Sequence, residues 1–278
     1  MPYHINEESE IIAAWLGFSG MGLALVLFLV PILTFKTIIK SRSTLEFDGS
    51  PYIFSLLNCG LWVIYATPSV TPNRMQPLII NSIGLVMEFM YCVIFTIYST
   101  EREFKKKLGV ALLFLFGIFV VVFVFFADDT SAASPYLGWL GSGLNIAMYG
   151  SPLSVMRQVW YSQSVEYMPL HLSLATFFCS FMWFLYGVFI NDLPISFCNI
   201  CGVLLGICQL CLYHRVSKYP NLSLIDMDKL KGRRGNGEIN GYKSLPGMDD
   251  TLEEEPDLNT VGSGNPYEKD AMDDFDAI

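Results

Sequence analysis

The chain has 278 residues, of which 53% are hydrophobic and 15% charged, and its mean hydropathy is +0.44. A composition this apolar excludes an ordinary soluble domain and is typical of a protein with several membrane spans. The net charge of −9 comes mainly from the acidic segment 249–278, and nothing in the composition points to a nucleic-acid partner.

Seven apolar stretches are long enough, or nearly so, to cross a bilayer, which takes about 20 residues of helix. We therefore predict an all-α integral membrane protein with seven transmembrane helices, whose lipid partner is the bilayer itself. In chain order the stretches are 11–35, 51–67, 76–98, 108–127, 136–160, 169–190 and 194–213. Because seven is odd, the two ends of the chain are expected on opposite sides of the membrane.

Basic residues in the connections predict the orientation by the positive-inside rule. The first and third connections and the flank after the last stretch are rich in Lys and Arg, whereas the other side has Arg74 as its only basic residue. We therefore expect the N-terminus outside and the C-terminus in the cytosol. The acidic start of the chain lacks the basic region of a cleavable signal peptide.

The chain contains an internal repeat with an offset of 121 residues. PILTFK at 31–36 recurs as PLSVMR at 152–157, and W-x-x-Y at 62–65 recurs at 183–186. The seven spans then divide as 3+1+3: a first three-helix repeat (10–98), a linker helix (108–127) and a second three-helix repeat (136–214). Because the linker adds one crossing, the repeats are parallel, and proteins built in this way bind their ligand near the midplane between the repeats.

A polar and aromatic stripe recurs in the second helix of each repeat. Asn58, Trp62 and Tyr65 share one helical face, since their spacing is i, i+4 and i+7. The matching residues of the second repeat are Cys179, Trp183 and Tyr186. Flat indole faces pack well against the C–H face of a sugar ring. The alternative is that the tryptophans only pack in the core.

An asparagine recurs in the third helix of each repeat, as Asn81 and Asn199. An amide inside a bilayer is costly without partners, so it usually faces a bundle interior or a wet cavity. An amide also supplies both a donor and an acceptor, as sugar hydroxyl groups require. We predict a sugar pocket walled by the two tryptophans and the two asparagines; interhelical hydrogen bonds are the alternative role of the amides.

Ionisable and metal-binding residues are scarce inside the spans. Glu88 is the only ionisable residue deep in a span; it either relays a proton or is hydrogen-bonded within the bundle. The C-x-x-C pairs at 198–201 and 208–211 have no histidine converging on them, so we predict no metal and no cofactor. The lack of Arg and Lys in mid-span favours a neutral substrate.

Prolines and a polar pair indicate two gates. We expect prolines at the cytosolic ends of spans one, two, five and six to act as hinges of a cytosolic gate. These prolines are Pro31, Pro51, Pro152 and Pro169. At the other end, Tyr65 and Asp192 are expected at similar depth, where a hydrogen bond between them would close an extracellular gate.

The segment 215–278 is polar, charged and rich in glycine, and is expected to be a disordered acidic tail in the cytosol. Two strings in it, YPNL (219–222) and YKSL (242–245), have the form of tyrosine sorting signals that trafficking adaptors recognise.

Taken together, several strings resemble the SWEET sugar transporters of the MtN3/saliva and PQ-loop group, over about residues 10–216. They include P-x-x-T-F-K (31–36), L-W-x-x-Y (61–65), Y-G-S-P-L-S-V-M-R (149–157) and S-V-E-Y-M-P (164–169). The resemblance implies a protein that is not an enzyme but moves sugar in both directions down its gradient by alternating access. It also implies a homo-oligomer, often a trimer, in the plasma membrane, or else in an endosomal, Golgi or vacuolar membrane.

The resemblance also implies roles for individual residues. It assigns Trp62, Trp183, Asn81 and Asn199 to sugar binding, the four prolines to hinges, and Tyr65 with Asp192 to the outer gate. Further positions that match family pocket residues are Ala24, Leu27, Asn58, Asn145, Met148 and Cys179. Family members often carry a small hydroxyl residue at three of these, where this chain has Ala24, Asn145 and Cys179. The bulk of Leu27 and Met148 favours a hexose over sucrose.

Three other functions compete with sugar uniport. A proton-coupled PQ-loop exporter of amino acids or other small solutes would need Glu88 or Asp192 to titrate. A seven-span receptor would share the orientation, but receptors are not built as two repeats. A scaffold acting through its tail would lose function on deletion of 220–278 and would not transport.

Overall fold

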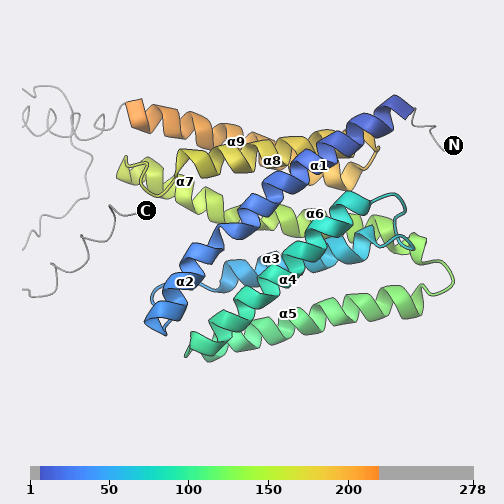
Figure 1. The fold of residues 1–278 in the computed structure, drawn as a ribbon, viewed down its shortest axis with the longest axis horizontal. Helices are drawn as coiled ribbons and strands as arrows, with labels where there is room; N and C mark the ends of the chain where they lie inside the picture. Colours follow the sequence, from blue (N-terminus) through green and yellow to red (C-terminus); the bar gives the residue numbers. More distant parts are fainter. Residues whose placement is uncertain (1–6, 219–278) are drawn as a thin grey trace, which may run out of the picture. The chain divides into compact units, whose positions relative to one another are not determined.

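The computed structural model describes residues 7–218, and its regular elements in that range are all helical (Figure 1). The α-helices are α1 (Glu7–Leu29), α2 (Pro31–Ser41), α3 (Ser50–Ala66), α4 (Met75–Tyr98), α5 (Arg102–Val120), α6 (Ser134–Met148), α7 (Gly150–Ser162), α8 (Leu170–Phe189) and α9 (Leu193–Lys218). A π-helical turn, η1 (Val121–Phe125), extends α5, and a 3₁₀ turn, η2 (Thr130–Ala133), precedes α6. Both tyrosine sorting strings and almost all of the predicted tail lie outside the described residues.

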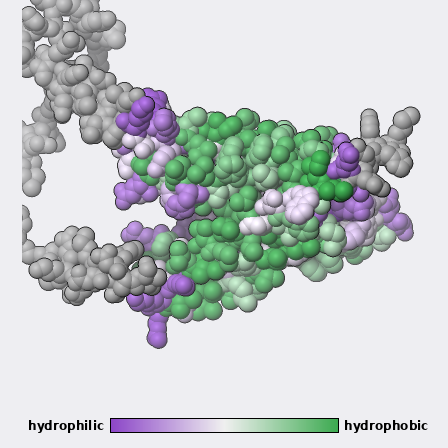
Figure 2. All heavy atoms as spheres, turned by 45° about the horizontal axis from the view of Figure 1, so that its top comes forward, coloured by the Kyte–Doolittle hydropathy of each residue, from purple (hydrophilic) through white to green (hydrophobic). Residues whose placement is uncertain are grey.

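The described helices account for the seven predicted spans. Five segments are long and apolar enough to cross a bilayer by length and composition alone: Glu8–Ser41, Met75–Tyr98, Arg102–Phe125, Leu170–Phe189 and Leu193–Lys218. The helix α3 is apolar but shorter, and α6 with α7 forms one interrupted segment. Figure 2 shows the result as a broad apolar belt with hydrophilic residues gathered at its two ends. The prediction of an all-α membrane protein is therefore confirmed.

Two of the predicted spans are broken at a proline, which corrects their boundaries. The first span continues to Ser41 and breaks before Pro31, and the fifth continues to Ser162 and breaks after Met148, four residues before Pro152. Proline has no N–H for the carbonyl four residues earlier, and its ring clashes with that carbonyl. Helix thus continues for about three turns beyond Pro31 and Pro152, and their place at the cytosolic ends of the spans stays a prediction. Pro51 and Pro169 do lie at helix ends, at the starts of α3 and α8.

The helices pack in two corresponding groups. In the first, α4 packs against both α1 and α3; in the second, α9 packs against both α6 and α8. The groups meet through α1 on α8 and α3 on α6. The linker α5 packs mainly on α3 and runs along the edge of the bundle (Figure 1). This is the 3+1+3 arrangement, and it leaves the second helix of each group facing the first helix of the other.

Candidate functional site

A central cavity of about 110 Å³ lies between the two groups of helices. Each of the six helices that form the two groups contributes to its wall. The lining residues are Ala24, Phe28, Asn58, Trp62, Pro77, Ile80, Asn81, Asn145, Trp183, Ile195 and Asn199. None of these eleven is charged, so the cavity offers apolar walls and four amides, and it suits a small neutral solute with several hydroxyl groups.

Each tryptophan packs on a glycine of the opposite group. A Cβ on Gly141 of α6 would lie 3.3 Å from the Trp62 ring, and a Cβ on Gly20 of α1 would lie 3.0 Å from the Trp183 ring. The two glycines are 121 residues apart, as the tryptophans are. The rings can approach this closely only because glycine has no side chain; a Cβ at either position would crowd the indole. Each ring is therefore held between its own helix and the first helix of the other repeat.

Asn81 and Asn199, in the third helix of each repeat, make equivalent side-chain hydrogen bonds. The amide nitrogen of Asn81 donates to the carbonyl of Pro77 at 2.9 Å, and that of Asn199 donates to the carbonyl of Ile195 at 2.8 Å. Each bond reaches back one helical turn, and within residues 7–218 no hydrogen bond occupies either side-chain oxygen. Both amides therefore present a fixed acceptor to the cavity. These bonds stay within one helix, contrary to the interhelical alternative.

Asn58 adds an acceptor to which no described residue donates a hydrogen bond. Its Oδ1 atom is buried and, within the described residues, accepts no hydrogen bond. An unmet buried acceptor costs about 1–3 kcal/mol. Because Asn58 lines the cavity, a ligand hydroxyl could meet this need. Its counterpart Cys179 is buried, with its sulfur 3.9 Å from the Gly20 carbonyl, and does not line the cavity.

A buried polar cluster closes one end of the bundle. Tyr65 donates from its hydroxyl to Asp192 Oδ2 at 2.6 Å, and Arg74 Nε donates to the same oxygen at 2.8 Å. The other carboxylate oxygen accepts from the backbone N–H of Ile195 at 3.1 Å. Asp192 immediately precedes α9, so it caps that helix while it joins the two repeats.

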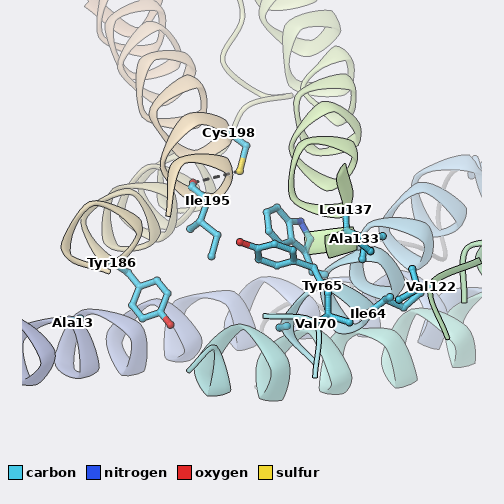
Figure 3. Packing of buried hydrophobic residues seen from close by; sticks show 12 residues of the cluster. Ala13, Ile64, Tyr65, Val70, Val122, Ala133, Leu137, Tyr186, Ile195 and Cys198 are labelled. Atoms are coloured by element: carbon cyan, nitrogen blue, oxygen red, sulfur yellow. Dashed lines mark hydrogen bonds between the residues drawn. The ribbon is translucent and has the colours of Figure 1, made fainter. Parts of the chain in front are cut away.

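A second tyrosine lies at the same depth. The Tyr186 hydroxyl donates to Gln76 Oε1 at 3.3 Å. Its ring stands edge-on to Trp183, with centroids 5.3 Å apart and planes at 82°, and Tyr65 meets Trp62 at 5.3 Å and 86°. In Figure 3, Ile195 of α9 points between the two tyrosine rings. Two matched aromatic pairs and an isoleucine thus cover this side of the cavity.

A separate, larger cavity of about 660 Å³ lies toward the opposite end of the bundle and shares no lining residue with the central pocket. Phe54 and Met148 line it, one helical turn from the pocket residues Asn58 and Asn145 respectively. Pro51 lines it too, at the start of α3. The central pocket is therefore covered at the end where Tyr65 meets Asp192, and the larger cavity hollows the bundle toward the other end.

The structure brings seven of the predicted substrate-binding residues into one wall: Ala24, Asn58, Trp62, Asn81, Asn145, Trp183 and Asn199. Three others lie elsewhere. Leu27 is half-buried on α1 outside that wall, Met148 belongs to the larger cavity, and Cys179 is packed behind the wall. None of these three side chains lines the central space.

Sequence reasoning missed several residues of this region. They are Phe28, Pro77, Ile80 and Ile195 in the wall, and Arg74 and Gln76 in the outer cluster. Pro77 and Ile195 could have been found, because each lies one turn before a predicted asparagine. Arg74 could also have been found, because it precedes Asp192 by 118 residues, the offset that relates Asn81 to Asn199.

Glu88 does not line the central cavity. It is buried in α4, and its Oε1 accepts a hydrogen bond from the Ser55 hydroxyl at 2.8 Å. Oε2 is buried without a partner among the described residues. The position equivalent to Glu88 in the second repeat is Gly206, so this carboxyl group is peculiar to the first repeat.

Comparison with known proteins gives a single family. The profile of the family described as "Sugar efflux transporter for intercellular exchange" matches residues 14–103 and again 135–221, which are the two repeats. The chain belongs to the SWEET family. It is an integral membrane protein of a transporter family, not an enzyme.

Relatives and a solved structure agree with this. The chain is 43% identical over 208 residues to the bidirectional sugar transporter SWEET1a of Sorghum bicolor, covering 73% of this chain and 77% of that one. It is 36% identical to SWEET2 of Arabidopsis thaliana, with 72% and 87% covered. A solved eukaryotic SWEET transporter superposes with a TM-score of 0.70 at 38% identity, covering 76% of this chain and all of that one.

Proposed function

We propose that this chain is a facilitative, bidirectional sugar uniporter that holds one sugar ring between Trp62 and Trp183. The observation that carries this proposal is the presence of two indole rings, one from each repeat, and four amides in a cavity lined by no charged residue. Indole faces suit the apolar face of a pyranose, and the free amide oxygens suit its hydroxyl groups. The relatives named above are bidirectional sugar transporters.

The substrate that we favour is a hexose. The bulk of Leu27 and Met148 cannot narrow the central pocket and so cannot explain this preference, because neither residue lines it. The small central volume of about 110 Å³ supports the same preference, since a disaccharide would need the space of a second ring. Equal counterflow of sucrose and glucose would contradict this preference.

Transport by alternating access fits the two unequal ends of the pocket. In this structure the Tyr65–Asp192–Arg74 cluster covers one end, and the larger cavity lies toward the other. With the N-terminus outside, this is an inward-facing state. The breaks at Pro31 and Pro152, together with Pro51 and Pro169, would let the inner ends of four helices move. We propose residence in the plasma membrane and assembly into a homo-oligomer such as a trimer, with trafficking adaptors reading the tail.

The test is counterflow of labelled glucose in proteoliposomes without a pH gradient. The intact protein is expected to accumulate label, and Trp183→Ala is expected to abolish accumulation. The matched control is Trp15→Ala, because Trp15 is 71% exposed on α1, away from the pocket. Equal accumulation by the intact protein and Trp183→Ala would discard the pocket. No counterflow by the intact protein would discard glucose as substrate.

A further inference from the structure

A third hollow lies on the outer surface of the bundle, between α7 and α9, with a volume of about 470 Å³. Its lining is mostly apolar and includes Trp160, Cys208, Cys211 and Leu212. Two arginines, Arg157 and Arg215, complete it. The sugar pocket shares none of these residues, so the hollow is a separate feature.

The residues from α9 form a stripe along the helix. Cys208, Cys211, Leu212 and Arg215 recur at the spacing of one helical face, with the arginine nearest the end at Lys218. Both cysteines are exposed. The stripe therefore runs from a charged group at the membrane edge to apolar side chains deeper in the span. This order matches a phospholipid, whose charged headgroup lies at the membrane edge and whose acyl chains lie inside.

Both guanidinium groups lie over aromatic rings, and neither forms an ion pair within the described residues. Arg215 lies over the Trp160 ring at 4.5 Å from its centroid, and Arg157 lies over the Tyr161 ring at 5.7 Å. Within residues 7–218, the ion pairs are Arg74–Asp192 and Lys106–Glu103, so neither arginine meets a carboxylate there. Stacking on aromatic rings orients a guanidinium and leaves its N–H groups free for an anion.

The first repeat lacks this arrangement. At the positions equivalent to Arg157, Trp160, Tyr161 and Arg215 it carries Lys36, Ile39, Lys40 and Ile97. At these positions it thus has two cations, but no aromatic residue and no cation on its third helix. The stacked arginine pair is therefore not required by the helical scaffold.

We propose that the hollow between α7 and α9 binds an anionic phospholipid. The two guanidinium groups would bind the headgroup phosphate, which accepts paired N–H bonds, and an acyl chain would lie over Leu212 and the two cysteines. With the orientation proposed above, the site faces the cytosolic leaflet, where anionic lipids are concentrated. A bound lipid would join α9 to α7, the inner half of the broken first helix of its repeat.

The experiment uses fluorescence quenching of the intact chain in vesicles. The protein is reconstituted in phosphatidylcholine vesicles that contain an equal fraction of either brominated phosphatidylglycerol or brominated phosphatidylcholine. Bromine quenches tryptophan on contact, and the Trp160 component is the difference between the intact protein and Trp160→Phe. We expect brominated phosphatidylglycerol to quench Trp160 several times more strongly than brominated phosphatidylcholine.

Two double variants complete the test. Arg157→Gln/Arg215→Gln is expected to lose the preference for the anionic lipid. Lys36→Gln/Lys40→Gln removes two cations at the equivalent height of the first repeat and is expected to keep it. Equal quenching by both lipids in the intact protein would overturn the proposal, and so would a preference that survives the arginine changes or disappears with the lysine changes.

A measurement on the intact protein alone guards against a misfolded variant. Protein released from mixed-lipid vesicles in mild detergent and weighed by native mass spectrometry is expected to retain phosphatidylglycerol over phosphatidylcholine. Retention of neither, or of both equally, would count against the site whatever the variants do. None of these readouts needs sugar, so they stand apart from the counterflow test of transport.

Discussion

The Tyr65 hydroxyl donates to Asp192 at 2.6 Å across 127 residues of chain and so connects the second helix of one repeat to the start of the third helix of the other. Arg74, from the first repeat, binds the same carboxylate oxygen. The Asp192 side chain is 1% exposed and Arg74 15%, so this ion pair is largely shielded from solvent. One carboxylate thus joins the repeats at the covered end of the pocket.

Tyr65→Phe is expected to open this end more often. The change removes the hydroxyl donor and keeps the ring, and a hydrogen bond to a charged group contributes about 1.5–3 kcal/mol. The equilibrium should therefore shift about tenfold or more toward states open at this end. The measurement is the labelling rate of Ala24→Cys by a membrane-impermeant thiol reagent added from outside, in both backgrounds.

Tyr186→Phe serves as its comparison. Tyr186 donates to a neutral amide at 3.3 Å, so its removal should have a smaller effect on labelling. If Tyr186→Phe accelerated labelling as much as Tyr65→Phe, the charged acceptor would have no special part in closing this end.

Gly20→Ala and Gly141→Ala are expected to weaken sugar binding. A new Cβ at these positions would lie 3.0 Å from Trp183 and 3.3 Å from Trp62. The indole would have to move, at a cost typical of overpacking, about 1–3 kcal/mol. The KM for glucose counterflow should rise by about tenfold.

The same helices supply the controls for this prediction. Gly22 and Gly143 are also 121 residues apart, and a Cβ on either meets nothing within 4 Å. Gly22→Ala and Gly143→Ala should leave KM unchanged, so they separate crowding of the indole from a general effect of alanine on these helices. A rise of KM in all four variants would show that the rings are not the cause.

The sequence was sufficient for the architecture because the apolar stretches and the 121-residue repeat constrain both the number and the pairing of the helices. It was also sufficient for Trp62 and Trp183, since a large aromatic residue repeated at one helical spacing indicates a shared face. The sequence could not place side chains within a turn. Leu27 and Met148 are repeat partners and both lie outside the central wall, whereas Asn58 lines it and its partner Cys179 does not.

The proline breaks illustrate a second limit. Hydropathy predicted apolar stretches at 11–35 and 136–160, each of which contains one of these prolines, Pro31 or Pro152. The helices instead resume after each break, as α2 to Ser41 and α7 to Ser162. A single missing backbone N–H interrupts a helix without ending the span, and only the geometry after the break shows this.

Glu88→Gln is expected to leave counterflow intact and independent of pH. The carboxyl group lies away from the central wall, and glutamine can still accept the Ser55 hydrogen bond through its side-chain oxygen. Uptake of glucose by the intact protein should also be unchanged by an imposed proton gradient. Uphill accumulation driven by such a gradient, and lost in Glu88→Gln, would favour the proton-coupled exporter instead.

Asn58→Ala is expected to weaken sugar binding without destabilising the fold. In the empty pocket the buried Oδ1 atom has no partner within the described residues, so its removal relieves a cost of about 1–3 kcal/mol. With sugar bound, the same change loses a hydrogen bond to a hydroxyl group. The KM for glucose should rise by about tenfold, while the Tm of the sugar-free protein stays the same or rises.

Ser142→Ala is the control for Asn58→Ala, because it is expected to change Tm and not KM. Its hydroxyl is buried and already donates to the Pro194 carbonyl at 2.7 Å, outside the central wall. Its removal should lower Tm and leave KM unchanged, because it breaks a satisfied bond that no ligand touches. Together the two variants distinguish binding from structure: an amide kept for the fold would behave like Ser142, with a lower Tm and no change in KM. If the Asn58 amide instead serves sugar binding, KM rises and Tm does not fall, because its oxygen accepts a hydrogen bond only while the pocket is occupied.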